Sequence, residues 1–322
     1  MPTAFVTGGS GFIGGALIER LRAEGWEVRA LSRSDAAAEK VRAHGALPVS
    51  GDIQDEVMMR VAAGEAEVAF HAAAKVQDWG DPDEFDRLNV KGTANVIAAC
   101  REAGVRRLVH VGTEAALMAG KPLVRVNEDT PLRPDSPALY SSSKAKAEQL
   151  VRAASGDGLE TVVIRPRFVW GRGDTTLLPT LVELVGSGRF RWVGGGRHLT
   201  ATTHVDNTVE GLWLGATKAP AGSVYFVTDG DPVVFREFVS LMLETQGVEP
   251  PTGSVPAALA GVAARVTERL WRLLRRSAPP PLTRFGVWVS SQECTIDIGR
   301  AERELGYRPV KSRDEGLAEL AG

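Results

Sequence analysis

Two side chains four residues apart, Tyr140 and Lys144, are the first pair in the sequence whose types and spacing suggest chemistry. If their segment is helical, both lie on one face of the helix. A free phenol has a pKa of about 10, and a neighbouring ammonium favours its phenolate form. Tyr140 could therefore exchange a proton near neutral pH with Lys144 as its electrostatic partner. On its own such a pair is also typical of a surface tyrosine on an amphipathic helix.

Three glycines near the start of the chain, Gly8, Gly11 and Gly14, stand between an expected strand at Ala4–Thr7 and an expected helix at Phe12–Glu24. Gly8 permits a tight turn, Gly11 lets the main chain approach phosphates, and Gly14 lets the helix pack close to the strand. Free N–H groups at the helix start favour negative charge. The position of the loop predicts a dinucleotide site rather than an ordinary glycine-rich turn. Its expected cofactor contacts are Gly8, Gly11, Phe12, Ile13 and Gly14.

The residues after the second expected strand bear on which dinucleotide is bound. An NAD site usually places an acid about 20 residues beyond the loop, whereas a 2′-phosphate requires arginine or a neutral donor. Ser32 stands where the acid is expected, and Arg33 follows it with a guanidinium that suits phosphate oxygens. The sequence favours NADP; the alternative is that Asp35 binds the ribose. Asp52 and Ile53 are expected at the edge of the adenine pocket, although Asp52 suits a helix cap nearly as well.

A third candidate catalytic residue, Thr113, ends the expected strand Leu108–Thr113. From a strand end its hydroxyl could reach the same carbonyl oxygen as Tyr140. Thr113 would then polarise the carbonyl, Tyr140 would give or take the proton, and the nicotinamide would give or take a hydride. Thr113, Tyr140 and Lys144 are therefore the predicted catalytic residues.

The elements around these residues alternate between strands and helices in the first half of the chain, which is typical of an α/β fold with a parallel sheet. We expect a dinucleotide-binding domain over residues 1–170 and a smaller lobe, mainly for the substrate, over residues 171–322. Residues 203–230 are expected to return to the first domain. The other expected strands are Glu27–Leu31, Val68–Ala73, Thr161–Val169 and Val224–Thr228. The other expected helices are Thr93–Ala103, Ser142–Ala154 and Phe235–Gln246.

The composition restricts the function classes. The chain has 322 residues, 38 basic and 40 acidic, so nucleic acid is not an expected partner, because that affinity comes largely from excess basic charge. The two cysteines form no metal or disulfide pattern, so no metal is expected. The same pattern predicts that the protein is located in the reducing cytoplasm. No apolar run of membrane-spanning length and no secretory signal is visible.

Taken together, the motifs resemble the extended short-chain dehydrogenase/reductase family. The resemblance rests on the loop Thr7–Gly14, the run His71-Ala72-Ala73-Ala74, Asn89-Val90-Lys91-Gly92-Thr93, Thr113, Tyr140 with Lys144, Arg165-Pro166 and Leu305-Gly306-Tyr307-Arg308-Pro309. It implies a Rossmann-like doubly wound sheet with a smaller C-terminal substrate-binding lobe. It also implies that Tyr140 and Lys144 contact the cofactor, that Ala72, Ala73 and Ala74 line it, and that Pro166 and Val169 flank its nicotinamide. Gly112-Thr113 departs from the Ser-Ser pair of many relatives but keeps the hydroxyl.

The segment Arg165–Asp174 is similar to the corresponding segment of the 3β-hydroxysteroid dehydrogenase and dihydroflavonol reductase branch. That branch implies an NAD(P)-dependent oxidoreductase that interconverts an apolar secondary alcohol and its ketone, of steroid-like or flavanone-like type. A nucleotide-sugar epimerase or dehydratase with tightly bound NAD is the alternative, and a non-catalytic dinucleotide sensor is a third interpretation. The candidate walls of the substrate pocket, each of which could equally be core, are Trp79, Met118, Phe168, Trp170 and Trp192. His71 and His204 are interpreted as structural, and Asn89 as either site-ordering or structural.

A basic amphipathic helix is expected at Leu259–Arg276, with arginines beside an apolar stripe, before the prolines at 279–281. One interpretation is peripheral contact with a membrane surface. The favoured interpretation is that the stripe covers the substrate pocket or meets another subunit. The resemblance also implies a homodimer formed through the helices at Thr93–Ala103 and Ser142–Ala154.

Overall fold

The computed structural model describes all 322 residues, and its largest element is a seven-stranded sheet. The strand order is β12-β7-β5-β4-β1-β2-β3, and every neighbouring pair is parallel. The strands are β1 (Thr3–Thr7), β2 (Glu27–Ser32), β3 (Leu47–Ser50), β4 (Val68–His71), β5 (Arg107–Val111), β7 (Glu160–Pro166) and β12 (Ser223–Val227). Because the strand order reverses between β1 and β4, a crevice forms beyond their carboxyl ends, where such folds bind ligands.

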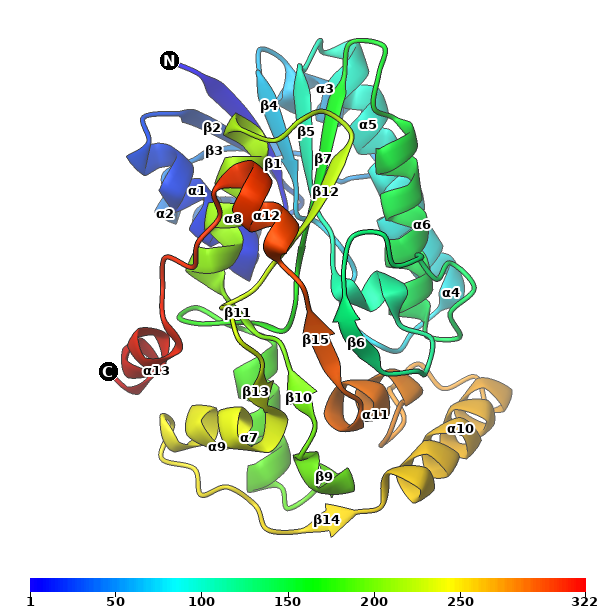
Figure 1. Cartoon of the computed structure of the whole chain (residues 1–322). Coiled ribbons are helices and arrows are strands. Elements are labelled where there is room, and N and C mark those ends of the chain that lie inside the picture. The colour runs from blue at the N-terminus through cyan, green and yellow to red at the C-terminus, as the bar shows by residue number, and fades with distance from the viewer.

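Helices cover both faces of this sheet, each over its own buried apolar cluster (Figure 1). One face carries α1 (Phe12–Ala23), α2 (Asp35–Ala43), α8 (Val205–Thr217) and α12 (Gly299–Leu305). The other carries α3 (Glu56–Ala63), α5 (Gly92–Glu102) and α6 (Leu139–Ala153). The predicted Rossmann-like, doubly wound fold is confirmed. β12 lies beside β7 at one edge of the sheet.

The second lobe, in the lower part of Figure 1, is built on a four-stranded sheet of order β13-β10-β15-β6. Its strands are β6 (Leu123–Val126), β10 (Leu199–Thr200), β13 (Val233–Val234) and β15 (Cys294–Ile296). Two short pairs, β8 (Val169–Trp170) with β11 (Thr203–His204) and β9 (Trp192–Val193) with β14 (Ser254–Val255), complete the strands. The remaining helices are α4 (Pro82–Phe85), α7 (Leu177–Gly186), α9 (Phe235–Glu244), α10 (Ala257–Leu273), α11 (Arg284–Ser291) and α13 (Arg313–Ala321), with the short turns η1 (Asp86–Lys91), η2 (Glu114–Leu117) and η3 (Gly194–Gly196).

Several boundaries differ from the sequence expectation, and the differences fall at the carboxyl edge of the sheet. β4 ends at His71 and β5 at Val111, so Ala72 to Ala74 and Thr113 lie beyond the strands. The expected strand Thr161–Val169 ends at Pro166, because Phe168 has a φ of +46°, which no extended strand allows. α6 begins at Leu139 rather than Ser142, so Tyr140 is helical. These changes place the predicted site residues in loops and helix starts facing one crevice.

The helix α10 does not bury its apolar stripe within this chain. Its buried residues are Ala260, Ala264 and Glu268, whereas Leu259, Val262, Val266, Leu270 and Leu273 are exposed. The prediction that the apolar stripe covers the substrate pocket is therefore wrong, because the helix packs through its small alanines. No helix in the chain combines the length and the apolar character that crossing a bilayer requires.

Candidate active site

The glycine loop between β1 and α1 leaves no room for side chains. Gly8 has a φ of +78°, and a Cβ there would lie 2.7 Å from the Ala73 nitrogen. A Cβ on Gly14 would lie 2.1 Å from the Gly8 carbonyl oxygen. Gly11 is the N-cap of α1, so no capping side chain accepts from the first N–H groups of the helix. Those free donors and the positive end of the helix suit a pyrophosphate, so the loop fits a dinucleotide.

Beyond β4, the partly buried Ala72, Ala73 and Ala74 lie beside this loop, and the buried His71 fixes their position. His71 Nδ1 lies 2.7 Å from Thr7 Oγ1, and its Nε2 lies 2.9 Å from Thr93 Oγ1. Burial, and secondarily the charge of Lys144, lowers the pKa of His71 to about 3, so the ring is neutral. The Thr93 hydroxyl donates to the Asn89 carbonyl oxygen, so it accepts from Nε2. His71 therefore ties β1 to α5 as a neutral hydrogen-bonding link.

Asn89 lies in the π-helical turn η1, directly before α5. Its Oδ1 accepts a hydrogen bond from the Lys75 nitrogen at 2.6 Å, and its Nδ2 donates to Ser143 Oγ at 2.9 Å. Single π turns are frequent at functional sites because they redirect one side chain out of the helical ladder. Asn89 thereby joins the segment after Ala74 to α6, next to Lys144.

At the expected adenosine end, β2 terminates at Ser32 and Ser34 caps α2, accepting from the Ala37 nitrogen. Arg33 and Asp35 are both exposed, and Arg33 has no carboxylate within 4.0 Å. After β3, Asp52 accepts from both the backbone and the side-chain nitrogen of Gln54, each at 3.0 Å.

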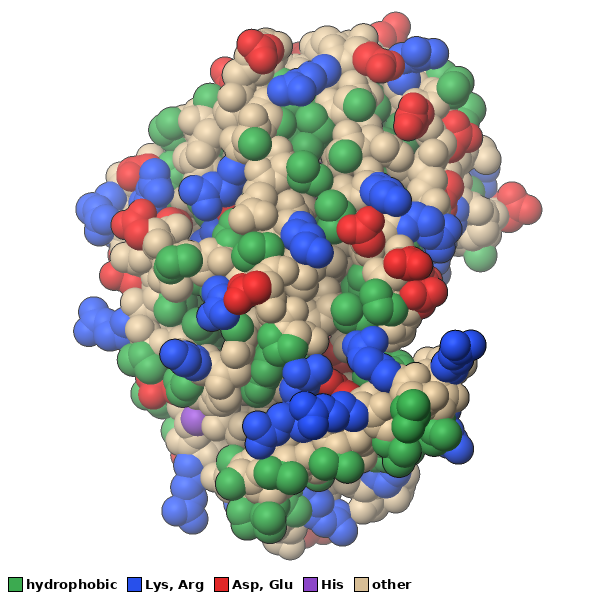
Figure 2. Space-filling view, turned by 90° about the vertical axis from the view of Figure 1, so that its right-hand side faces the viewer, with side chains coloured by type: hydrophobic (Ala, Val, Ile, Leu, Met, Phe, Trp, Pro, Cys, Tyr) green, Lys and Arg blue, Asp and Glu red, His purple; other side chains and the backbone are tan.

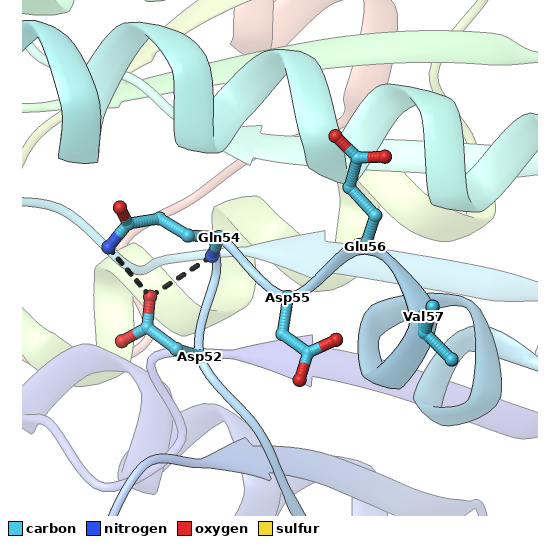
Figure 3. A pocket seen from close by; sticks show the side chains of 5 residues that line it. All are labelled: Asp52, Gln54, Asp55, Glu56 and Val57. Carbon is cyan, nitrogen blue, oxygen red and sulfur yellow. Dashed lines mark hydrogen bonds between the residues drawn. The ribbon is translucent and has the colours of Figure 1, made fainter.

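Figure 3 shows these two residues facing each other in an open depression that Asp55, Glu56 and Val57 complete. Ile53 is buried beside it. Because three carboxylates line the depression, it suits a base or a ribose better than a phosphate.

The three predicted catalytic residues meet at the end of β5. Lys144 Nζ donates to the Val111 carbonyl oxygen at 2.8 Å and lies 3.4 Å from His110 Nε2. Thr113 is the N-cap of η2, where its hydroxyl oxygen accepts from the Ala115 nitrogen at 3.1 Å, and its side chain acts on the pKa of the Tyr140 phenol. The Tyr140 ring is partly buried and packs edge-on against Phe285, with 5.6 Å between ring centroids.

The site shifts the pKa values of both titrating groups. Burial lowers the pKa of Lys144 to about 8, although the charge of Glu148 acts in the opposite direction. Burial and then the charge of Glu114 raise the pKa of Tyr140 well above its usual value, while Thr113 lowers it. An unassisted Tyr140 would thus be a poor acid, so a cation at Lys144 is needed to stabilise its phenolate.

Two buried ion pairs that the sequence did not predict support this site. Arg167 Nη1 lies 2.5 Å from Glu114 Oε1, and Arg165 Nη2 lies 2.5 Å from Glu148 Oε1. All four side chains are at most 5% exposed. Thr113 Oγ1 donates to the second oxygen of Glu114 at 2.8 Å. The available signal was that charged residues interrupt otherwise apolar segments, because charges in such segments are almost always paired.

The remaining predicted residues are placed as follows. Pro166 ends β7, and Val169 begins β8. The five candidate pocket residues do not form one wall. Met118 packs with the cluster around Trp288, while Phe168 lies between the lobe clusters that contain Trp170 and Trp192.

The three tryptophans each satisfy their indole N–H inside the protein. The acceptor is Asp229 Oδ2 for Trp170, the Pro251 carbonyl oxygen for Trp192 and the Arg276 carbonyl oxygen for Trp79. Trp170 and Trp192 are at most 1% exposed. Their rings are therefore held in place by the lobe itself.

One group of residues, His204, Asp206 and Glu319, brings potential metal ligands within 4.8 Å of one another. Lys311 Nζ pairs with both carboxylates, lying 3.7 Å from Asp206. An ammonium group of the chain already faces these carboxylates, so their charge is balanced without an ion.

The fold and this constellation define an NAD(P)-dependent oxidoreductase of the extended short-chain dehydrogenase/reductase type. The family model described as "3-beta hydroxysteroid dehydrogenase/isomerase family" matches residues 5–257, and the chain belongs to that family. The predicted family, fold and enzyme class are thereby confirmed.

Relatives and solved structures similar to this chain support the same family and enzyme class. The chain is 46% identical to a "4-hydroxy-2-methyl-3-oxo-4-farnesyl-3,4-dihydroquinoline-1-oxide ketoreductase" of Stigmatella aurantiaca, over 98% of this chain and 95% of the relative. It is 38% identical to a "2-alkyl-3-oxoalkanoate reductase" of Stenotrophomonas maltophilia, over 98% and 97% of the two chains. The dTDP-glucose 4,6-dehydratase DesIV of Streptomyces venezuelae, solved with NAD bound, superimposes with a TM-score of 0.77 at 25% identity, over 99% and 95% of the chains. A nicotinamide dinucleotide is therefore the cofactor.

Proposed function

We propose that the protein is a ketoreductase that interconverts an apolar ketone and its secondary alcohol, with NADP as cofactor. The observation that carries the proposal is the convergence of Thr113, Tyr140 and Lys144 at the crevice that the glycine loop also faces. The bound reduced dinucleotide supplies the hydride. Tyr140 gives its proton to the carbonyl oxygen in the reductive direction and takes it back in the oxidative one.

Lys144 stabilises the phenolate left on Tyr140. Its ammonium is held by the Val111 carbonyl oxygen and approaches the neutral imidazole of His110, so no carboxylate touches it. The full positive charge is thus available to Tyr140 one helical turn away.

Thr113 has a single hydroxyl proton, and Glu114 accepts it. For Thr113 to donate to a substrate carbonyl, that proton must turn away from Glu114. Arg167 keeps the Glu114 carboxylate paired throughout, so turning the hydroxyl does not leave a buried charge without a partner.

The pH profile follows from Lys144. Because its pKa is near 8, the ammonium is lost as the pH rises through that value, and the support for the phenolate is lost with it. We expect kcat/KM to fall on an alkaline limb near pH 8. In Lys144→Arg the side chain stays charged at every accessible pH, so the limb should vanish from whatever activity remains. An unchanged limb in this variant would contradict the assignment.

The preference for NADP rests on Arg33, whose exposed guanidinium has no carboxylate partner, and on Ser32 in place of an acid. We expect Arg33→Ala to raise the KM for NADPH by about tenfold or more, as befits one lost charge-assisted contact, and to leave the KM for NADH unchanged. Lys40→Ala, which removes an exposed cation on α2, is the matched control and should change neither constant. Equal effects on both cofactors would remove the 2′-phosphate role.

The substrate class is proposed from the relatives. The named substrates of the two reductases carry a farnesyl or an alkyl chain beside a ketone, which supports an apolar carbonyl substrate. We propose that residues 1–170 with 203–230 bind the cofactor and that residues 171–322 mainly bind the substrate. The test is nicotinamide absorbance turnover with NADPH and NADH against a panel of steroid-like, flavanone-like and alkyl ketones and their alcohols. No turnover with either cofactor would overturn the proposal.

The alternative, a nucleotide-sugar epimerase or dehydratase, has support from the fold match to DesIV. The identity with the two reductases is higher, at 46% and 38% against 25%, which favours the ketoreductase. Release of NAD and a sugar nucleotide from denatured purified protein would support the epimerase. A pure dinucleotide sensor needs neither Tyr140 nor Lys144, and the chain has both.

The assembly is proposed to be a homodimer through α5 and α6. The small exposed side chains Ala94 and Ala98 on α5 support close approach of a partner helix. A cytoplasmic location is proposed on Cys100 and Cys294, both buried and unpaired. The mass measured by analytical ultracentrifugation tests the dimer.

A further inference from the structure

The helix α10 packs against the rest of the protein with its smallest side chains. Ala260, Ala264 and Glu268, spaced four residues apart, are its buried positions. Glu268 is neutralised at this contact, because its Oε2 lies 2.6 Å from Arg284 Nε and its Oε1 accepts from the Arg284 nitrogen at 2.6 Å. The fully buried positions of the inner face are therefore two alanines and a paired glutamate, with Trp271 partly buried beside them.

Those large apolar residues form a stripe on the opposite side, facing away from the protein. The stripe consists of Leu259, Val262, Val266, Leu270 and Leu273, with exposed fractions of 66%, 50%, 57%, 45% and 80%. Spacings of three and four residues place them on one helix face. Including Leu274, six of the fifteen large hydrophobic side chains that the whole surface exposes lie in these sixteen residues. Apolar surface concentrated in this way marks an interaction site.

Unpaired arginines accompany the stripe. Arg265, Arg269 and Arg272 run along one flank of the helix, and Arg275 and Arg276 follow its end. None of the five has a carboxylate within 4.0 Å, and the one acid between residues 256 and 291 is the buried Glu268. Figure 2 shows basic and hydrophobic side chains gathered together on the lower lobe, where α10 projects.

We propose that α10 lies in the surface of an anionic lipid bilayer, with the apolar stripe in the acyl boundary and the arginines among the headgroups. An apolar face bordered by arginines is the pattern of interfacial helices. A second copy of the chain fits less well, because pairing this face with itself would bring like-charged arginine rows together with no carboxylate between them. An anionic bilayer would bury the apolar stripe in its acyl region and pair the arginines with its negatively charged headgroups.

The position of α10 relates this surface to the catalytic tyrosine. α10 packs on α11, and Phe285 of α11 contacts the Tyr140 ring. α10 and the residues after it also hold Trp79. The Arg272 guanidinium lies 4.8 Å from the centre of the Trp79 ring, and the Trp79 N–H donates to the Arg276 carbonyl oxygen. The bilayer surface would therefore lie one helix away from Tyr140, on the side of the lobe to which apolar substrates are assigned above.

The test is co-sedimentation of the full chain with vesicles of phosphatidylcholine alone or mixed in equal parts with phosphatidylglycerol. We expect binding to the anionic vesicles that weakens with salt and little binding to the neutral ones. Arg265→Gln with Arg269→Gln should weaken it about thirty-fold, and Val266→Glu with Leu270→Glu at least tenfold. The matched control is Val124→Glu with Leu241→Glu, which charges two other exposed apolar residues and should bind as the unchanged chain does.

All three variants should keep turnover of a water-miscible ketone, which shows that they fold and separates this test from that of the proposed function. Failure of the unchanged chain to sediment with anionic vesicles overturns the proposal. Binding that survives the loss of the apolar stripe also overturns it. If the stripe variant instead converts a dimer to a monomer and no vesicle binding is seen, the surface belongs to a second copy.

Discussion

Tyr140→Phe should lower kcat by about a thousandfold, within the usual range for loss of a positioned general acid, and leave the affinity for NADPH within about twofold. The change removes one oxygen and keeps the ring that packs on Phe285, so the site should otherwise hold its shape. Absorbance turnover gives kcat, and a titration of NADPH fluorescence gives the affinity.

Tyr225→Phe is the matched control. Its ring is fully buried, but its hydroxyl donates to Glu304 on the opposite side of the sheet from α6, so turnover should persist. If Tyr140→Phe turned over substrate at the normal rate while still binding cofactor, Tyr140 would not be the proton donor.

Arg167→Met should destabilise the protein by about 3 to 5 kcal/mol, because it leaves the Glu114 carboxylate buried without its cation. The double variant Glu114→Leu with Arg167→Met should recover most of that loss, since replacing both charges by apolar groups removes the unpaired one. Urea unfolding of the four proteins in this cycle measures the coupling between the two positions.

The exposed pair Arg189 and Glu183 serves as a comparison, and Arg189→Met should leave the unfolding midpoint unchanged. An Arg167→Met effect as small as that one would mean that solvent reaches Glu114. In the double variant Thr113 also loses its hydrogen-bond acceptor, so its activity reports separately on how Thr113 is positioned.

The parts of the site that the sequence predicted are local in the chain. The glycine loop joins a strand to the next helix, and Tyr140 and Lys144 share one helical turn, so residue type and spacing suffice to place them. The doubly wound parallel sheet followed from the family resemblance and from the alternation of elements. The strand ends were less accurate, because a single positive φ at Phe168 decides where β7 stops.

The parts that sequence reasoning missed depend on long-range pairing. Glu114 and Arg167 are 53 residues apart in the sequence, and Arg165 and Glu148 are 17 apart, so no local sequence pattern predicts either ion pair. The orientation of α10 was missed for a different reason. Its period was identified correctly, but the expectation that the apolar stripe covers the substrate pocket failed, because alanines and Glu268 make the contact within the chain instead.

The four-stranded sheet delays completion of the catalytic site until late in the synthesis of the chain. It pairs β6, in the first half of the chain, with β15, whose residues Cys294–Ile296 come close to the end of synthesis. Phe285, which packs on Tyr140, is made only shortly before. A nascent chain can therefore pair the strands of the large sheet early, since the last of them, β12, ends at Val227. It cannot add α12 to that sheet or complete the surroundings of Tyr140 until nearly all of the chain has been synthesised. Incomplete chains would then contain the glycine loop for the cofactor but not the finished catalytic site.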